Sequence, residues 1–229
     1  MLKRKKDIIK VLLKENPRFQ LKSGTEKLKS SEKLFWGGAK EINQLERVSH
    51  ALSENTLRYI NSIVKPDTVT LETGGGYSTI IFGVNSKRHI CVNPDRTSNQ
   101  LIIDFLEKYG YSIESLEFIE LSSDIALPAL KDIDKIDIAL IDGNHSFPFP
   151  IIDWYYIDKY LIPGSKILID DSQINSIKIL CGYLKVEPAY KYIRSIGRCM
   201  VFEKISEVIT MGWAFQEINK LELRKIFEI

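Results

Sequence analysis

Three consecutive glycines followed by two hydroxyl side chains form the stretch of this 229-residue sequence best suited to hold a ligand. The segment reads Glu72-Thr73-Gly74-Gly75-Gly76-Tyr77-Ser78-Thr79. Glycine has no Cβ, so the backbone can turn sharply there and come close to a bound molecule. The segment is not a Walker loop, because no Gly-Lys-Ser/Thr follows, and it lacks the third glycine of a dinucleotide fingerprint. A plain glycine-rich turn between a strand and a helix is the alternative interpretation.

Acidic residues end two later β-rich segments. Asp142 follows the first of them, and Asp170-Asp171 ends the second. Carboxylates that neighbouring strands bring together repel one another unless a cation lies between them. A Mg²⁺ ion bound by Asp142, Asp170 and Asp171 would meet that need, because a hard cation prefers oxygen ligands. The alternatives are a cationic ligand, or one aspartate that caps the next helix while the others face solvent.

His145 follows Asp142 by three residues and is the best candidate for a general base. An ordinary histidine has a pKa of about 6.5, so it can accept a hydroxyl proton at neutral pH. We therefore predict His145 and Asp142 as catalytic residues. The alternative for His145 is that it only orders its loop by hydrogen bonding. His50 lies in a helical pattern and His89 opens a strand, so both are interpreted as structural.

The elements that must position these residues alternate along the chain. Short β-rich runs lie at 69–72, 89–92, 116–121, 136–141 and 166–170. Helical patterns lie between them, near 77–85, 96–109, 124–131, 151–161 and 173–185. This alternation predicts a parallel sheet with helices on both faces, whose ligands bind at the carboxyl ends of the strands.

The two ends of the chain depart from the alternation. Runs at 190–196 and 198–204, separated by Gly197, predict a closing antiparallel pair. Further helical patterns cover 7–15, 44–63 and about 214–227.

The glycine segment resembles the first motif of class I S-adenosylmethionine-dependent methyltransferases, in the branch that reads acid-x-Gly-x-Gly-x-Ser-Thr. That branch also has a strand ending in Ile-Asp-Gly-x-His and a later strand ending in Asp-Asp. The matching residues are Asp142-Gly143, His145, Asp153-Trp154, Pro163-Gly164 and Asp170-Asp171. The similarity spans roughly residues 45–204. It implies a Rossmann-like α/β fold with a seven-stranded, mostly parallel sheet whose last strand is antiparallel.

The resemblance implies that the protein is an enzyme that uses S-adenosylmethionine to methylate an oxygen of a sugar or another small hydroxylated metabolite. The sulfonium of that cofactor is then a second candidate for the cation beside the aspartates. Two alternatives remain open. One is a non-catalytic Rossmann-like interaction module, and the other is a hydroxylase-like enzyme, because proteins related to cephalosporin hydroxylase share this motif set.

The resemblance also assigns cofactor-binding residues. They are Glu72, Thr73, Gly74, Gly75, Gly76, Ser78, Thr79, Asn93, Asp95, Ser123, Asp124 and Asp142. In the family an acid at the end of the second strand holds the ribose hydroxyls. Here Asn93 occupies that place and Asp95 lies two residues on, so either could bind the ribose. Asp124 would contact the adenine or cap a helix.

An aromatic stretch, Phe147-Pro148-Phe149-Pro150, comes directly after the candidate base, and Trp154-Tyr155-Tyr156 follows it. It would wall an acceptor pocket or belong to the core. For Trp154 and Tyr155 we predict the core.

The charge divides the chain into two parts. Residues 1–33 hold eleven Lys/Arg and four Asp/Glu, a balance of +7, whereas the rest holds 21 and 26, a balance of −5. We predict a basic N-terminal helical arm, residues 1–43, that covers the active site as a flap, and a methyltransferase domain at 44–229. The arm lacks the interleaved aromatics of nucleic-acid binders, which argues against such a partner. A weak contact of the arm with an anionic membrane surface stays open.

Composition excludes several classes of protein. With 44% hydrophobic and 27% charged residues the chain is that of a soluble globular protein. No apolar run reaches the roughly 18 residues that cross a bilayer. Three scattered cysteines predict neither a disulfide framework nor a zinc site, and favour the cytoplasm. The expected partner is a small-molecule acceptor, and a homo-oligomer stays open.

Overall fold

One seven-stranded sheet forms the centre of the part of the chain that the structure describes. The computed structural model describes residues 8–15, 52–208 and 212–222. The strands are β1 (Val69–Thr73), β2 (Arg88–Val92), β3 (Leu116–Ile119), β4 (Ile136–Ile141), β5 (Leu161–Ile169), β6 (Tyr190–Ile196) and β7 (Cys199–Lys204). They lie in the order β3-β2-β1-β4-β5-β7-β6. Among these strands β7 alone runs antiparallel to its neighbours, so the predicted sheet with an antiparallel last strand is confirmed.

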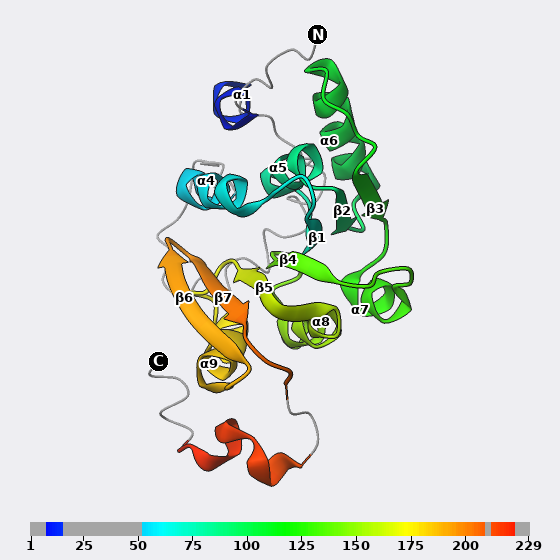
Figure 1. Cartoon of the computed structure of the whole chain (residues 1–229). Helices are drawn as coiled ribbons and strands as arrows, with labels where there is room; N and C mark the ends of the chain where they lie inside the picture. Colours follow the sequence, from blue (N-terminus) through cyan, green and yellow to red (C-terminus); the bar gives the residue numbers. More distant parts are fainter. Residues whose placement is uncertain (1–7, 16–51, 209–211, 223–229) are drawn as a thin grey trace, which may run out of the picture.

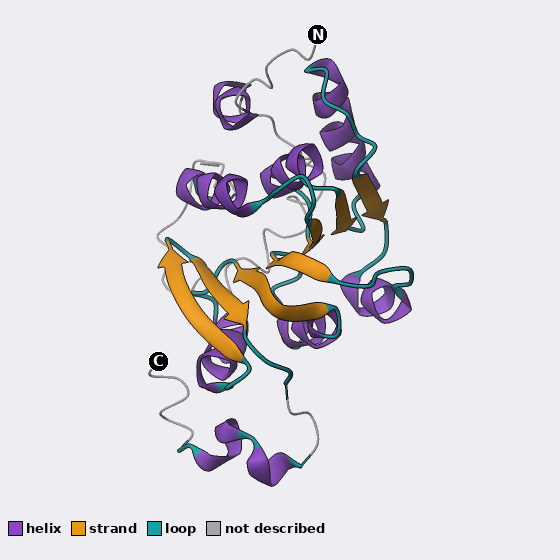
Figure 2. Cartoon of the chain, in the orientation of Figure 1, coloured by secondary structure: helices purple, strands orange, loops and turns teal. Residues whose placement is uncertain are grey.

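Helices cover both faces of the sheet, as predicted (Figure 1, Figure 2). The α-helices are α1 (Ile8–Glu15), α4 (Glu54–Ile63), α5 (Tyr77–Asn85), α6 (Arg96–Lys108), α7 (Ser123–Ala126), α8 (Phe149–Asp158) and α9 (Asn175–Val186). Short 3-10 helices are η2 (Leu127–Ala129), η3 (Trp213–Phe215) and η4 (Glu217–Lys220). One core cluster joins α1, α4, α5 and α6 to the sheet, and a second joins α7, α8 and α9 to the other face.

The sequence of β4 shows why the sheet is buried on both sides. Successive side chains of a strand point to opposite faces. Ile138 and Leu140 belong to the core cluster with α4, α5 and α6, whereas Ala139 and Ile141 belong to the cluster with α8 and α9. All four are buried. A continuous apolar run is therefore what a central parallel strand requires.

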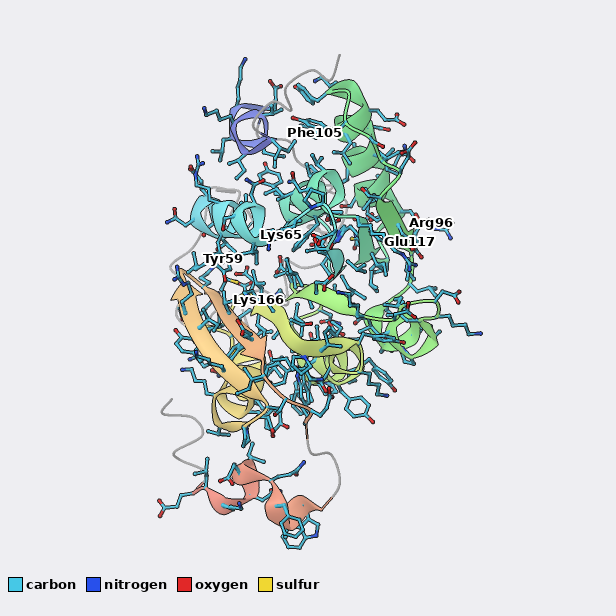
Figure 3. All side chains as sticks on the ribbon, viewed as in Figure 1. Tyr59, Lys65, Arg96, Phe105, Glu117 and Lys166 are labelled. Carbon is cyan, nitrogen blue, oxygen red and sulfur yellow. The ribbon has the colours of Figure 1, made fainter. Side chains whose placement is uncertain are left out.

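Helix α1 packs against the body of the protein. Ile8, Ile9 and Leu12 are buried in the same core cluster as residues of α5 and α6. Figure 3 labels Phe105 on α6, which lies on the side of that helix toward α1. The rest of the predicted arm lies outside the described residues, so its role as a flap, and the domain boundary at residue 43, stay predictions.

Two predicted helices differ from the structure. The pattern at 44–63 yields α4 only from Glu54, because the Ser53 hydroxyl caps the helix by accepting the N–H of Thr56 at 3.2 Å. Residues 44–51, with His50, lie outside the described residues. The predicted helix at 214–227 was wrong where it can be compared, since η3 and η4 replace it. Trp213 and Phe215 there are 76% and 73% exposed, so little packing supports a longer helix.

One side chain predicted for the core lies elsewhere. Trp154 is buried and contacts Tyr183 edge-on, as a core residue should. Tyr155 is 47% exposed and was assigned wrongly to the core, because the next position on α8 faces away from the sheet. Among the described residues, no helix is long and apolar enough to span a bilayer.

Candidate cofactor and active site

The predicted site residues converge at one edge of the sheet. Strands β1, β4 and β5 are neighbours, so the residues that follow their carboxyl ends come together. The Asp142 N–H donates to Thr73 O at 3.1 Å, and the Asp170 N–H donates to Ile141 O at 3.1 Å. The glycine loop, Asp142 and Asp170 are therefore tied into one surface by backbone hydrogen bonds.

The glycine loop is held very close to the neighbouring strand ends. Gly74 has a φ of +83°, and a Cβ there would lie 2.3 Å from the backbone oxygen of Asp142. A Cβ on Gly75 would lie 2.7 Å from Nδ2 of Asn93. At Gly76 a Cβ would meet nothing within 4 Å. Two of the glycines are thus required by packing, while the third borders open space at the start of α5.

Two predicted cofactor residues lie beneath this loop. Glu72 and Thr79 are both fully buried. The Thr79 hydroxyl donates to Glu72 Oε1, and the Gly76 N–H donates to Thr79 Oγ1 at 2.9 Å. Their side chains therefore support the loop from inside. Ser78, in the first turn of α5, is also buried.

The end of β2 places Asn93 and Asp95 in different settings. Asn93 is buried, and its Nδ2 donates to Asn99 Oδ1 at 2.7 Å. Asp95 is exposed and caps α6, since its Oδ1 accepts the N–H groups of Thr97 and Ser98 at 3.0 and 3.1 Å. Asn93 is thus the residue that directly borders the glycine loop, beside Gly75.

The segment after β3 excludes one of the two predicted roles of Asp124, and its contact with the adenine stays a prediction. Ser122 occupies the cap position of α7, so Asp124 is not its cap; it lies exposed in the first turn. Ser123 is buried and lies with Thr73 beside the carboxyl group of Asp153. Burial raises the pKa of Asp153 to about 6, although the Ser123 and Thr73 hydroxyls act in the opposite direction.

His145 lies between two carboxylates. Its Nε2 is 3.7 Å from Asp142 Oδ1 and 3.5 Å from Asp171 Oδ2. The side chain is 27% exposed, although its Nε2 atom is itself buried. The loop that carries it is fixed from α9, because the Ser176 hydroxyl donates to the His145 backbone oxygen. Asp142, His145 and Asp171 each offer one donor atom, and these atoms all lie within 4.8 Å of one another, close enough to bind one metal ion.

Negative charge accumulates at this edge of the sheet. Removal from water, followed by the charges of Asp170, Glu72 and Asp171, raises the pKa of Asp142 well above its usual range. Burial and then the charge of Asp171 also raise the pKa of Asp170. Because these carboxylates are desolvated and repel one another, a cation bound between them would be stabilised.

Arg198 supplies a cation that the sequence reasoning missed. Its guanidinium lies 3.0 Å from Asp171 Oδ1 and 3.8 Å from Asp170 Oδ2. Arg198 lies in the tight turn between β6 and β7. Because β7 runs antiparallel to β5, that turn must lie beside the end of β5. The predicted antiparallel pair puts Arg198 in a turn, but only the strand order brings that turn beside β5.

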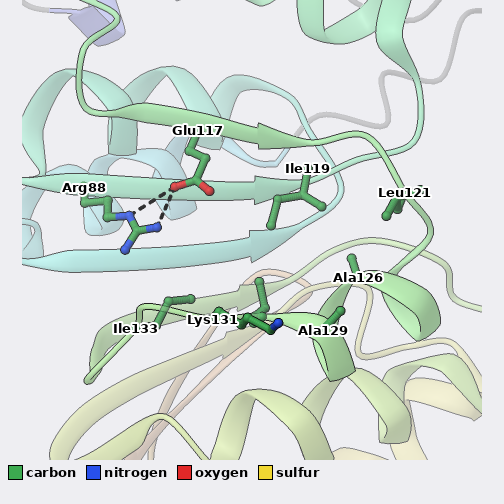
Figure 4. Close-up of a pocket in the computed structure, with 9 residues that line it drawn as sticks. Arg88, Glu117, Ile119, Leu121, Ala126, Ala129, Lys131 and Ile133 are labelled. Carbon is green, nitrogen blue, oxygen red and sulfur yellow. Dashed lines mark hydrogen bonds and ion pairs between the residues drawn. The ribbon is translucent and has the colours of Figure 1, made fainter.

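A separate cavity of about 340 Å³ opens at the edge strand β3 (Figure 4). Ile119 and Leu121 line it from the strand side, and the Arg88–Glu117 ion pair lies at its wall. None of its lining residues is a predicted site residue.

Comparison with known proteins identifies the fold and the class. Residues 71–172 match the family model described as a methyltransferase domain. Residues 71–172 therefore form a methyltransferase domain, in agreement with the resemblance to class I S-adenosylmethionine-dependent methyltransferases. The match begins before the glycine loop and ends just after Asp171, so it includes the residues that converge at the sheet edge of this methyltransferase. No curated protein matches the chain significantly.

Solved structures resemble this methyltransferase in fold. A Klebsiella pneumoniae protein described as a "putative O-methyltransferase" has a TM-score of 0.63 at 16% identity, covering 90% of this chain and 93% of that one. The O-methyltransferase TomG of Streptomyces achromogenes, in complex with S-adenosylmethionine, has a TM-score of 0.54 at 16% identity, covering 68% and 82%. Cofactor-bound Rv0187 from MTB has a TM-score of 0.57 at 16% identity, covering 70% and 83%.

Proposed function

We propose that this methyltransferase transfers the methyl group of S-adenosylmethionine to a hydroxyl oxygen of a sugar or another small hydroxylated metabolite. The observation that carries the proposal is the position of His145. It lies between Asp142 and Asp171, at the same edge of the sheet as the glycine loop. A partly exposed imidazole with carboxylate neighbours is suited to accept a proton from a hydroxyl group.

The glycine loop fits the amino-acid end of the cofactor. Gly76 borders open space at the N-terminus of α5, a helix of nine residues, where backbone N–H groups attract a carboxylate. Asn93 beside the loop is our candidate for the ribose, with Asp95 as the alternative. Ser123 and Asp124 are the candidates for the adenine. The like charges that raise the pKa of Asp142 support the proposal, because a positive charge such as a sulfonium would offset them.

His145 is our candidate for the base that takes the proton from the acceptor hydroxyl. Bound S-adenosylmethionine supplies an electrophilic methyl group and a neutral thioether leaving group. As the acceptor oxygen forms its new bond to carbon, its proton moves to Nε2 of His145. Asp142 and Asp171 stabilise the positive charge that the imidazole then carries. Holding the two reactants in line supplies a further large part of the rate.

Asp142, Asp170 and Asp171 stay our candidates for a Mg²⁺ site. The structure places Asp142 and Asp171 together with His145, whereas Asp170 faces Arg198. Carboxylate oxygens suit Mg²⁺, but the guanidinium 3.0 Å from Asp171 already offsets part of the charge. Activity that survives exhaustive treatment with EDTA would exclude a catalytic Mg²⁺.

The surroundings of His145 are compatible with a small acceptor. Phe147, two residues on, is 63% exposed and could line one side of a bound sugar ring. The three cysteines are unpaired and buried, as expected for the cytoplasmic location that we propose.

Calorimetry with S-adenosylmethionine and S-adenosylhomocysteine tests the cofactor, and methyl transfer to a panel of hydroxylated metabolites tests the reaction. His145→Ala should lower turnover by roughly 10²–10⁴-fold, the usual contribution of a general base, with little change in cofactor affinity. The control is Asn144→Ala on the same loop, an exposed residue whose replacement should keep most activity. No cofactor binding at millimolar concentration would overturn the proposal.

A further inference from the structure

Four polar side chains lie fully buried beneath the glycine loop and form one chain of hydrogen bonds. Thr70 Oγ1 lies 2.8 Å from His89 Nδ1, and His89 Nε2 lies 3.1 Å from Glu72 Oε1. Glu72 Oε1 also accepts the hydroxyl of Thr79. Each of the four side chains is 0% exposed. Such a network is costly to bury unless its members satisfy one another.

The direction of each hydrogen bond follows from what the groups can do. An ionised Glu72 only accepts, so both Thr79 Oγ1 and His89 Nε2 donate to it. With its proton on Nε2, the imidazole accepts at Nδ1 from the Thr70 hydroxyl. Thr79 Oγ1 in turn accepts the Gly76 N–H at 2.9 Å. The chain therefore ends on the backbone of the glycine loop.

The position of His89 makes it the centre of this chain. His89 lies on β2 opposite Thr70 of β1, and its imidazole stacks on Phe82 of α5 with ring centroids 4.9 Å apart. The ionisable groups that face it are Glu72 and, one step further along β2, Cys91. The backbone N–H of His89 donates to Ser115 O at 2.6 Å, which fixes the start of the strand.

Glu72, His89 and Cys91 also have the spacing of metal ligands, but the contacts do not favour a metal. Both ring nitrogens of His89 already have partners. Burial and the charge of Glu72 raise the pKa of the Cys91 thiol well above its usual value, so it stays protonated. A metal would need a thiolate and a free imidazole nitrogen.

We propose that His89 is a positioning residue for the cofactor loop. Its Nε2–H orients Glu72, Glu72 orients the hydroxyl of Thr79, and Thr79 holds the Gly76 N–H. The next N–H groups of α5 are thereby aimed at the ligand before it arrives, which lowers the ordering cost of binding. This inference rests on the proposed binding of S-adenosylmethionine at the loop.

Two substitutions at the same site separate this role from a structural one. In His89→Gln the amide nitrogen can reach the place of Nε2 and donate to Glu72. In His89→Asn the shorter amide reaches only the place of Nδ1. Both remove the imidazole, so both should lower the melting temperature of the cofactor-free protein. Only His89→Asn should weaken binding of S-adenosylhomocysteine, by about ten-fold (about 1.4 kcal/mol), with His89→Gln within about three-fold.

Thr79→Val and Thr79→Ser test the next link of the chain, should His89→Asn fail to fold. Valine keeps the shape and removes the hydroxyl, so binding should weaken by about ten-fold, whereas serine should retain it. Amide hydrogen exchange at Gly76 should be faster in His89→Asn and Thr79→Val than in their matched partners.

The outcomes distinguish this inference from the proposed function. If the wild-type protein binds no cofactor, both fall. If the wild-type protein binds it and the two members of each variant pair bind equally well, the proposed function stands and the role of His89 is overturned. If affinity follows the donor, with Gln and Ser near wild type and Asn and Val weaker, the inference is supported.

Discussion

At the scale of single residues, the site is governed by negative charge that the fold brings together. Asp142, Asp170 and Asp171 come from the ends of two neighbouring strands, and Arg198 offsets part of their charge. Asp142 keeps a raised pKa in spite of that cation. A positively charged ligand would offset this repulsion and stabilise the ionised form of its carboxyl group.

Asp142→Asn should reduce the affinity for S-adenosylmethionine more than that for S-adenosylhomocysteine. The first ligand carries a sulfonium charge and the second does not, so only the first loses an attraction. We expect about a ten-fold loss for the charged ligand and less than about three-fold for the neutral one, measured by calorimetry. Asp104→Asn, on the exposed face of α6, is the matched control. Equal losses for both ligands would show that Asp142 acts through shape and not through charge.

Asp153 gives a second prediction at this scale, on stability and pH. Its pKa is near 3.8 in the unfolded chain and about 6 in the folded protein, so the unfolded state binds fewer protons between these values. Stability from this group is therefore lost as the pH rises from about 4 to about 6. The shift corresponds to roughly 3 kcal/mol at neutral pH.

Asp153→Asn should remove the loss of stability that the ionisation of Asp153 causes as the pH rises. Urea unfolding should show the variant more stable than wild type by up to about 3 kcal/mol at pH 7.5, and no more stable below about pH 4. The exposed Asp104→Asn controls for the change of net charge. A difference of the same size at both pH values would contradict the assignment.

At the scale of elements, the turn from β1 into α5 is shaped by packing as much as by backbone freedom. Gly74 and Gly110 share a positive φ, of +83° and +72°, and both follow the end of an element. Only at Gly74 would a Cβ meet a neighbouring strand, 2.3 Å from Asp142 O. At Gly110 it would meet open space.

Gly74→Ala should therefore cost more than Gly110→Ala. The left-handed conformation alone costs about 1–2 kcal/mol for a residue with a Cβ, and this is what we expect at Gly110. At Gly74 the loop or Asp142 must also move, so the loss of unfolding free energy should be clearly larger, and cofactor binding should weaken. Denaturant titration of the two variants measures the difference. Equal costs would mean that the loop yields without strain.

At the scale of the whole molecule, part of the basic N-terminal segment belongs to the folded body. Helix α1 buries Ile8, Ile9 and Leu12 in the core cluster formed with α4, α5 and α6. This placement accounts for the apolar stripe in an otherwise charged stretch. It gives residues 8–15 a packing role that is separate from the flap predicted for the arm.

Leu12→Ala and the neighbouring Leu13→Ala test the packing role of α1. Leu12 is 0% exposed and Leu13 is 42% exposed. Truncation of a buried leucine costs about 2–5 kcal/mol, whereas the exposed one should change unfolding free energy by less than about 0.5 kcal/mol. Chemical unfolding of both variants is the measurement. A Leu12→Ala variant as stable as wild type would show that α1 is not docked in solution.

The sequence by itself determined the order and type of the central elements and most of the candidate site. The continuous apolar run of β4 and the 3.6-residue period of the helices both depend on local burial, which neighbouring residues record. The glycine loop, Asp142, His145 and Asp170-Asp171 could be predicted because each lies within a few residues of the end of a strand. Element ends were less well predicted, since caps such as Ser53 and weak packing around Trp213 decide them.

Only the tertiary structure decided which of these residues meet. The order β1-β4-β5-β7 brings the Arg198 turn to Asp171, and the pairing of β1 with β2 brings His89 to Glu72. Neither partner is a sequence neighbour of the other, so no local pattern records the contact. The sequence alone indicated that the carboxylates would repel one another. That an arginine from the antiparallel turn offsets their charge became clear only from the strand order.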